Sequence, residues 1–127
     1  MGKERNYTAK VVSSSRELTA KERIMLKDTS DAIKLDVATS EQAIIIYPIL
    51  WATIEIHNEK SEDKDYTQFV IVDKDGTKYV TGSISFYNAF SDIAEDMEDE
   101  TEEWGIKAYK LPSKNFAGRD FITCSII

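Results

Sequence analysis

Three strand-like segments between residues 50 and 82 constrain the fold more than any other feature of this chain. LWATIEIHNE alternates, because Ala52, Ile54 and Ile56 fall on one side and polar or aromatic residues fall on the other. DYTQFVIVD is rich in β-branched and aromatic residues, which favours a strand. The DKDG that follows is typical of a tight turn, with Gly76 able to take positive φ, and TKYVTG is the return strand.

A helix and two further strands complete this pattern. Phe86, Phe90, Ile93 and Met97 recur at helical spacing, and Ser85 is placed to cap the helix that they predict. WGIKAYKL and DFITCSII then have the length and content of strands. Three strands, a helix and two strands is the order of the OB-fold. The predicted fold is therefore mainly β with one helix, an OB-fold-like five-stranded Greek-key barrel, although other small α+β folds share this order.

The first third of the chain has two interpretations. Residues 1–127 are expected to form a single domain, with 50–127 as the OB-like core and 1–49 as an extension that adds strands, the first of them in YTAKVV. Thr19 and Glu22 have the spacing of a capping box, which favours a helix. The alternation in RIML and AIKLD instead favours a hairpin across DTSD. We expect the hairpin.

Composition argues against several function classes. The chain has 127 residues, 42% of them apolar, which suits one core. No apolar run is long enough to span a bilayer, and MGKERNYTAK lacks the apolar part of a signal peptide, so we expect a cytoplasmic protein with no membrane partner. Cys124 and His57 are each the only residue of their kind, which excludes a disulfide and clustered metal ligands of these types. With no phosphate loop or dinucleotide fingerprint either, we expect no catalysis, cofactor or metal.

Charge is distributed unevenly along the chain. The net charge is −7, and DIAEDMEDETEE carries eight acidic residues and no basic one. From Gly105 onward four basic residues face one acid, Asp120, so this last part is net positive. An overall acidic balance argues against nucleic-acid binding through bulk charge, but not against a local basic site.

The last part of the chain has the chemistry of a site for single-stranded nucleic acid. LPSKNFAGRD joins the last two predicted strands, and OB-folds use this connection to bind oligonucleotides. A single strand needs cations along its phosphates and flat rings for its bases. Lys107 and Tyr109 share one side of the first of these strands, and Phe121 lies on one side of the second. The predicted nucleic-acid-binding residues are Lys107, Tyr109, Lys110, Lys114, Phe116, Arg119 and Phe121.

Each of these residues also has an ordinary structural explanation. Alternation does not say which side of a strand is buried, so Tyr109 and Phe121 could belong to the core. Phe116 could plug the end of the barrel. Lys114 and Arg119 could be solubilising surface charges.

The segments HNEKSEDKDYTQFVIVDKDGTKYVTGSISFYNAFSDIAEDM and LPSKNFAGRDFITCSI resemble small single-stranded-DNA-binding proteins of phages and mobile elements of Gram-positive bacteria. The resemblance covers about residues 50–127. It implies an OB-like barrel, sequence-tolerant binding of single-stranded DNA or RNA, and a non-enzymatic role in DNA replication or recombination. The partners would be replication or recombination proteins, and further copies of the chain. Cellular members usually end in an acidic tail, whereas this chain ends in CSII, so recruitment through such a tail is in doubt.

A second hypothesis belongs to a different class. A carboxylate-rich helix on a small acidic protein could mimic DNA phosphates and inhibit a nucleic-acid enzyme, as phage-encoded anti-restriction or anti-CRISPR proteins do. The acids of DIAEDMEDETEE would then face a basic partner protein. The ordinary explanation of the same run is the solvated face and frayed end of a helix.

Overall fold

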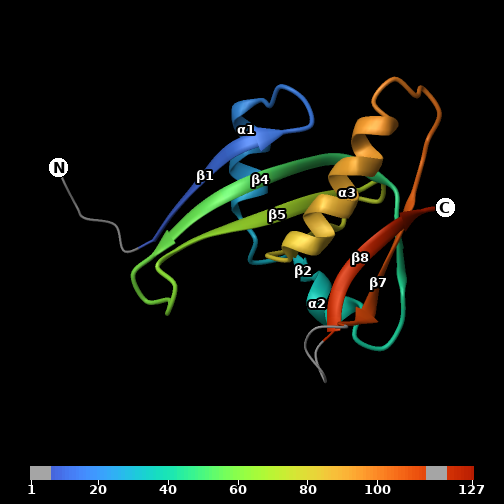
Figure 1. Ribbon diagram of the computed structural model, residues 1–127. Coiled ribbons are helices and arrows are strands. Elements are labelled where there is room, and N and C mark those ends of the chain that lie inside the picture. Colours follow the sequence, from blue (N-terminus) through green and yellow to red (C-terminus); the bar gives the residue numbers. More distant parts are fainter. Residues whose placement is uncertain (1–6, 114–119) are drawn as a thin grey trace.

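The computed structural model describes residues 7–113 and 120–127, and it is mainly β (Figure 1). A five-stranded sheet has the spatial order β1 (Tyr7–Ser14), β4 (Pro48–Asn58), β5 (Asp65–Asp73), β6 (Lys78–Thr81), β2 (Ile33–Lys34). A three-stranded sheet has the order β3 (Ile44–Ile46), β7 (Ile106–Pro112), β8 (Asp120–Ile126). The helices are α1 (Ala20–Lys27), α2 (Leu35–Ala38) and α3 (Ile84–Asp96). No helix in the described part of the chain is long and apolar enough to cross a membrane.

The two sheets are joined through β3 and β4, which only Tyr47 separates. β3 pairs with β7 in the small sheet, and β4 pairs with β5 in the large one, in both cases antiparallel. The remaining neighbours needed for a barrel do not meet, because β6 pairs with β5 and β2 while β8 pairs with β7. The expected strand order is therefore present from β4 to β8, but the sheets of the described residues do not close into a barrel.

The large sheet is buried on both faces along part of its length. Ala52, Ile54 and Ile56 alternate as predicted and are buried on the face that also holds Leu26 of α1. β5 is buried without interruption from Phe69 to Asp73, because its two faces belong to two different core clusters. The sequence of a strand that is buried on both faces is a continuous apolar run, and FVIV in β5 is such a run.

Helix α3 fills the second cluster between the two sheets (Figure 1). Phe86 and Phe90 are fully buried, as their helical spacing predicts. Phe90 lies 5.1 Å from Trp51 and 6.1 Å from Trp104 between ring centroids, so both tryptophans contribute to the core. The capping residue is Ser83, whose side chain accepts from the Phe86 amide, and not Ser85 as predicted. Ser85 instead donates its hydroxyl to the carbonyl oxygen of Ile122, which ties α3 to β8.

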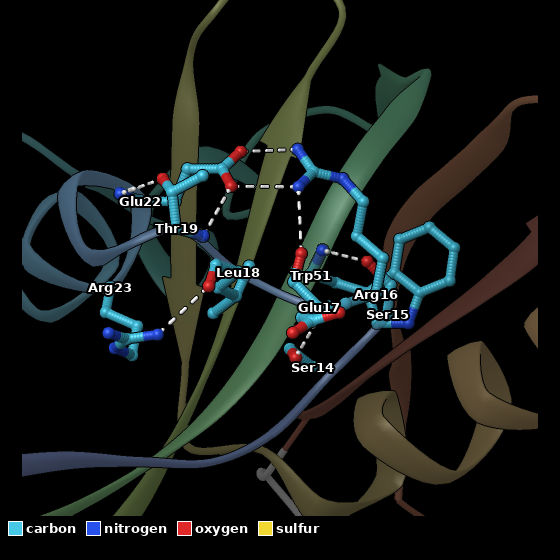
Figure 2. A network of polar contacts seen from close by, with 9 residues as sticks. All are labelled: Ser14, Ser15, Arg16, Glu17, Leu18, Thr19, Glu22, Arg23 and Trp51. Atoms are coloured by element: carbon cyan, nitrogen blue, oxygen red, sulfur yellow. Dashed lines mark hydrogen bonds and ion pairs between the residues drawn. The ribbon is translucent and has the colours of Figure 1, made fainter.

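The prediction of a hairpin in the N-terminal third is wrong, because the structure has a helix there. The capping box of Thr19 and Glu22 is formed, with both reciprocal hydrogen bonds, and it begins the eight-residue helix α1 (Figure 2). Arg16 adds a bidentate pair to the Glu22 carboxylate at 2.6 and 2.9 Å, and the pKa of Glu22 falls to about 2 because of this pairing and the backbone bond at Thr19. Ser15 exchanges two hydrogen bonds with the Trp51 backbone, which attaches this segment to β4.

The end of α1 is held by a buried lysine. Lys78 of β6 is 7% exposed, and its ammonium donates to the carbonyl oxygens of Met25 and Asp28 and pairs with Asp31 at 2.7 Å. These contacts satisfy the carbonyl of Met25 in the last turn of the helix and that of the C-cap residue Asp28. Residues 7–49 thus contribute directly to the core, where Leu26, Leu35 and Ile46 are fully buried. The predicted tight turn is also formed, with Gly76 at φ +91°.

Candidate nucleic-acid interface

The outer face of the three-stranded sheet brings together several residues of the predicted site. The pairing register places Lys107 beside Ser125, Tyr109 beside Thr123, and Leu111 beside Phe121. The alternate residues of both strands point inward, and Ile106, Ala108, Ile122 and Cys124 are buried against α3. The structure therefore shows which side of each strand faces the core, and it places Tyr109 and Phe121 on the solvent side.

Tyr109 is held in place by its two neighbours on this face. Its hydroxyl lies 2.7 Å from the Ser125 Oγ, and either oxygen can donate in that hydrogen bond. The Lys107 ammonium lies 5.7 Å from the centroid of the Tyr109 ring, within the range of a cation–π contact. A ring fixed at both its edge and its face loses little freedom when a ligand stacks on it.

Apolar side chains surround this pair. Phe121 is 37% exposed, its cross-strand partner Leu111 is 40% exposed, and Ile45 of the neighbouring strand β3 is 44% exposed. Ile45 lies beside Lys107 in the pairing register. The outer face thus offers two aromatic rings, two aliphatic side chains and a cation to the solvent. We call these five residues, Ile45, Lys107, Tyr109, Leu111 and Phe121, the outer-sheet patch.

Lys110 does not belong to this patch. It follows Tyr109 and therefore points to the opposite face of β7, where it lines a cavity of about 220 Å³ with Asp36 and Asp120. Phe121 of the outer-sheet patch lines this cavity as well. Carboxylates in this cavity make it unlike a phosphate site. The predicted residues Lys114, Phe116 and Arg119 lie outside the described residues, so their placement relative to the patch stays a prediction.

Cys124 lies directly behind the patch on the inner face of β8. It is 7% exposed, and burial raises the pKa of its thiol to about 12. The thiolate, which is the reactive form, is therefore scarce at neutral pH. Cys124 is therefore a residue of the core.

His57 forms a separate polar cluster at the far end of the β4–β5 hairpin. Its Nδ1 lies 2.7 Å from the Asp65 carboxylate and its Nε2 lies 2.7 Å from that of Glu59, which also pairs with Lys64 at 3.4 Å. The hydrogen bond to Asp65 raises the pKa of His57 most, and the hydrogen bond to Glu59 raises it further. With both ring nitrogens engaged, the imidazole braces the charged turn. Within residues 7–113 and 120–127 no group of three metal-ligating side chains is placed to hold an ion.

Sequence reasoning missed three contributors to the patch region. Ser125 falls on the same side of β8 as Phe121 by simple alternation, but its hydrogen bond to Tyr109 depends on the pairing register. Leu111 is the last residue of the predicted strand WGIKAYKL, and nothing in the sequence assigns it to the site. Ile45 lies in β3, a three-residue strand inside the apolar run AIIIYPILWA, where no alternation distinguishes it.

Comparison with models of protein families, with curated proteins and with solved structures finds no match to this chain. The candidate interface is defined by its geometry.

Proposed function

We propose that this protein binds single-stranded DNA without sequence preference through the outer-sheet patch and the connection between β7 and β8. The observation that carries the proposal is the solvent-facing pair of rings, Tyr109 and Phe121, with the Lys107 ammonium beside the first ring. Bases stack on such rings regardless of sequence, while lysines follow the phosphates. RNA would satisfy the same groups.

The strand arrangement supports an OB-like origin for this site. The β3–β4 segment serves as the first strand, β5 and β6 as the second and third, and β7 returns beside the first. That spatial order is the Greek key. In this interpretation α3 occupies the opening between β6 and β8, where it contacts β8 and the core of the large sheet. We infer that the two sheets form an open, OB-like arrangement in which a helix takes the place of the last strand pairing.

The location of the patch differs from the face that OB-folds commonly use. They often bind along the second and third strands together with two loops. Here one face of β5 and β6 packs against Leu26 of α1, and the other packs against α3. Both faces are therefore occupied where these strands are buried, and the outer face of β7–β8 is left for the ligand.

The energetics of the patch are compatible with useful affinity despite the net charge of −7. Stacking contributes about 1–3 kcal/mol per base, so two rings would contribute about 2–6 kcal/mol. Charges more than about 10 Å away are largely screened at moderate salt, which limits repulsion by the distant acids. The role in phage or mobile-element replication or recombination is supported by the resemblance of residues 50–127 alone.

A titration of labelled oligo-dT followed by fluorescence anisotropy tests the proposal. We expect saturable binding whose affinity falls as salt rises, because phosphate contacts release counterions. Phe121→Leu keeps an apolar side chain but removes the ring, and it should weaken binding. Tyr7→Ala is the matched control, since Tyr7 is 45% exposed on β1 of the other sheet. Equal weakening by the two substitutions, or no binding by the wild type at low salt, would reject the patch.

A DNA-mimic inhibitor is the second candidate, and one observation favours it. All eight acids between Asp92 and Glu103 are exposed, and among the described residues only Glu103 is paired, with Lys74 at 3.3 Å. A mimic would ignore oligo-dT and would bind a basic nuclease or helicase instead. The same titration therefore separates the two candidates.

A further inference from the structure

A groove of about 380 Å³ lies where β7 begins and β8 ends, beside Gly105 and Ile127. Its apolar lining is formed by Tyr47, Met97, Trp104, Ile126 and Ile127. Its rim is acidic, formed by Glu100, Glu102 and Glu103 from the turn after α3. We call it the acid-rimmed groove. β7 runs from Ile106 to Pro112, so at about 3.3 Å per residue the two ends of the hairpin lie roughly 20 Å apart.

The apolar lining of the groove is built for close contact. A Cβ atom at Gly105 would lie 2.8 Å from the Tyr47 ring, so the ring can pack here only because residue 105 is glycine. Trp104 is fixed from behind by Trp51, 5.8 Å away between ring centroids. Ile126 is 49% exposed and Ile127 is 56% exposed, which leaves apolar surface open to a ligand.

The edge of the groove already holds one cation from the chain itself. The Lys74 ammonium lies 4.1 Å from the Tyr47 ring centroid and 3.3 Å from the Glu103 carboxylate. This position combines the two groups that recognise an ammonium or guanidinium, an aromatic face and a carboxylate. Glu100 and Glu102 have no ion-pair partner within residues 7–113 and 120–127, and both are exposed.

We propose that the acid-rimmed groove is the docking site for a basic, partly apolar segment of a partner protein. An arginine or lysine of the partner pairs with Glu100 and Glu102, and an adjacent aliphatic side chain covers Trp104 and Ile126. The volume fits side chains, since small-ligand pockets span about 300–1,000 Å³. The acidic rim repels phosphates, so we expect the nucleic acid on the outer face of the hairpin and not in this groove. This inference does not depend on the nucleic-acid proposal, because it uses none of the patch residues.

The test uses a fluorescein-labelled hexapeptide, Arg-Leu-Arg-Leu-Gly-Arg, and the same peptide with glutamate in place of arginine. Binding is followed by anisotropy, and the contact surface is mapped by chemical-shift changes of the backbone amides and the tryptophan indole N–H groups. We expect the basic peptide to bind, the acidic one not to bind, and the largest shifts to fall at Trp104, Gly105 and residues 100–103.

Two variants and a control make the result decisive. Glu100→Gln with Glu102→Gln should raise the Kd about 2- to 30-fold, the effect of losing two exposed ion pairs. Ile126→Lys places a cation in the groove at a half-exposed position and should abolish binding without unfolding the protein. The control, Glu62→Gln with Asp63→Asn, removes the same charge from the exposed β4–β5 turn. An equal loss in the control, an unmoved Trp104 signal at saturation, or no binding of the basic peptide would overturn the proposal.

Discussion

Substitutions of Tyr109 separate the contribution of its ring from that of its hydroxyl. Tyr109→Ala removes the ring, and loss of one stacking contact of about 1–3 kcal/mol raises the Kd for oligo-dT about 5- to 160-fold. Tyr109→Phe keeps the ring but loses the 2.7 Å hydrogen bond to Ser125. Ordering the freed ring on binding then costs about 0.5–1.5 kcal/mol of binding free energy. This cost raises the Kd only about two- to twelvefold.

The assay is an anisotropy titration of labelled oligo-dT, with thermal unfolding measured on every variant. Tyr109 is half-buried at the surface, so each variant should remain folded. Ser125→Ala should match Tyr109→Phe, because both remove the same hydrogen bond, and the two changes together should be no worse than either alone. If Tyr109→Ala binds as tightly as the wild type while the wild type does bind oligo-dT, the ring is not a stacking platform and the reasoning is refuted.

Three further predictions test the core, the thiol and the histidine. Phe90→Ala removes a fully buried ring and should lower the free energy of unfolding by about 3–5 kcal/mol in urea, whereas an unchanged midpoint would place Phe90 outside the core. Cys124, with its pKa raised to about 12, should not react with a disulfide reagent at pH 8 until the protein unfolds; rapid reaction of the native protein would contradict its burial. The raised pKa of His57 means that protonation favours the folded state, so the stability lost in His57→Gln should be largest below the unfolded pKa of about 6.5 and should vanish as pH rises through the folded pKa. An NMR titration that places the His57 pKa at or below that of an unfolded histidine would contradict this sign.

Regular periodicity accounts for the parts of the fold that the sequence predicts. β4 follows from the alternation in LWATIEIHNE, and α3 follows from the helical spacing of Phe86 and Phe90. β5 follows from its β-branched and aromatic residues, and β6 follows from the tight turn at Gly76 before it. β4 and α3 bury mainly one face, so their periodicity is a local signal, whereas β5 is buried on both faces and is recognised by its continuous apolar run. α1 was missed because Ile24 and Leu26 alternate by chance, while Ile24 is 66% exposed and only Leu26 is buried. The capping box at Thr19 was the better signal, since it specifies the helix start through its own hydrogen bonds.

The remaining features depend on pairing between distant segments. β3 and β2 are only three and two residues long, and their partners lie about 60 and 45 residues away along the chain. No local pattern specifies such contacts. Within the candidate site, alternation along β7 places Lys107 and Tyr109 on one face and Lys110 on the other, and both placements can be predicted from the sequence.

Photocrosslinking is the most direct test of the central claim, that unpaired bases lie on the outer face of the β7–β8 sheet. An oligo-dT with 5-iodouracil at each position in turn is irradiated with the protein, and the modified residues are mapped by mass spectrometry. The account predicts crosslinks at Tyr109 and Phe121, reduced by competition with unlabelled oligo-dT. Crosslinks confined to Tyr66 on β5 or Tyr87 on α3, with Tyr109 and Phe121 unmodified, would contradict it.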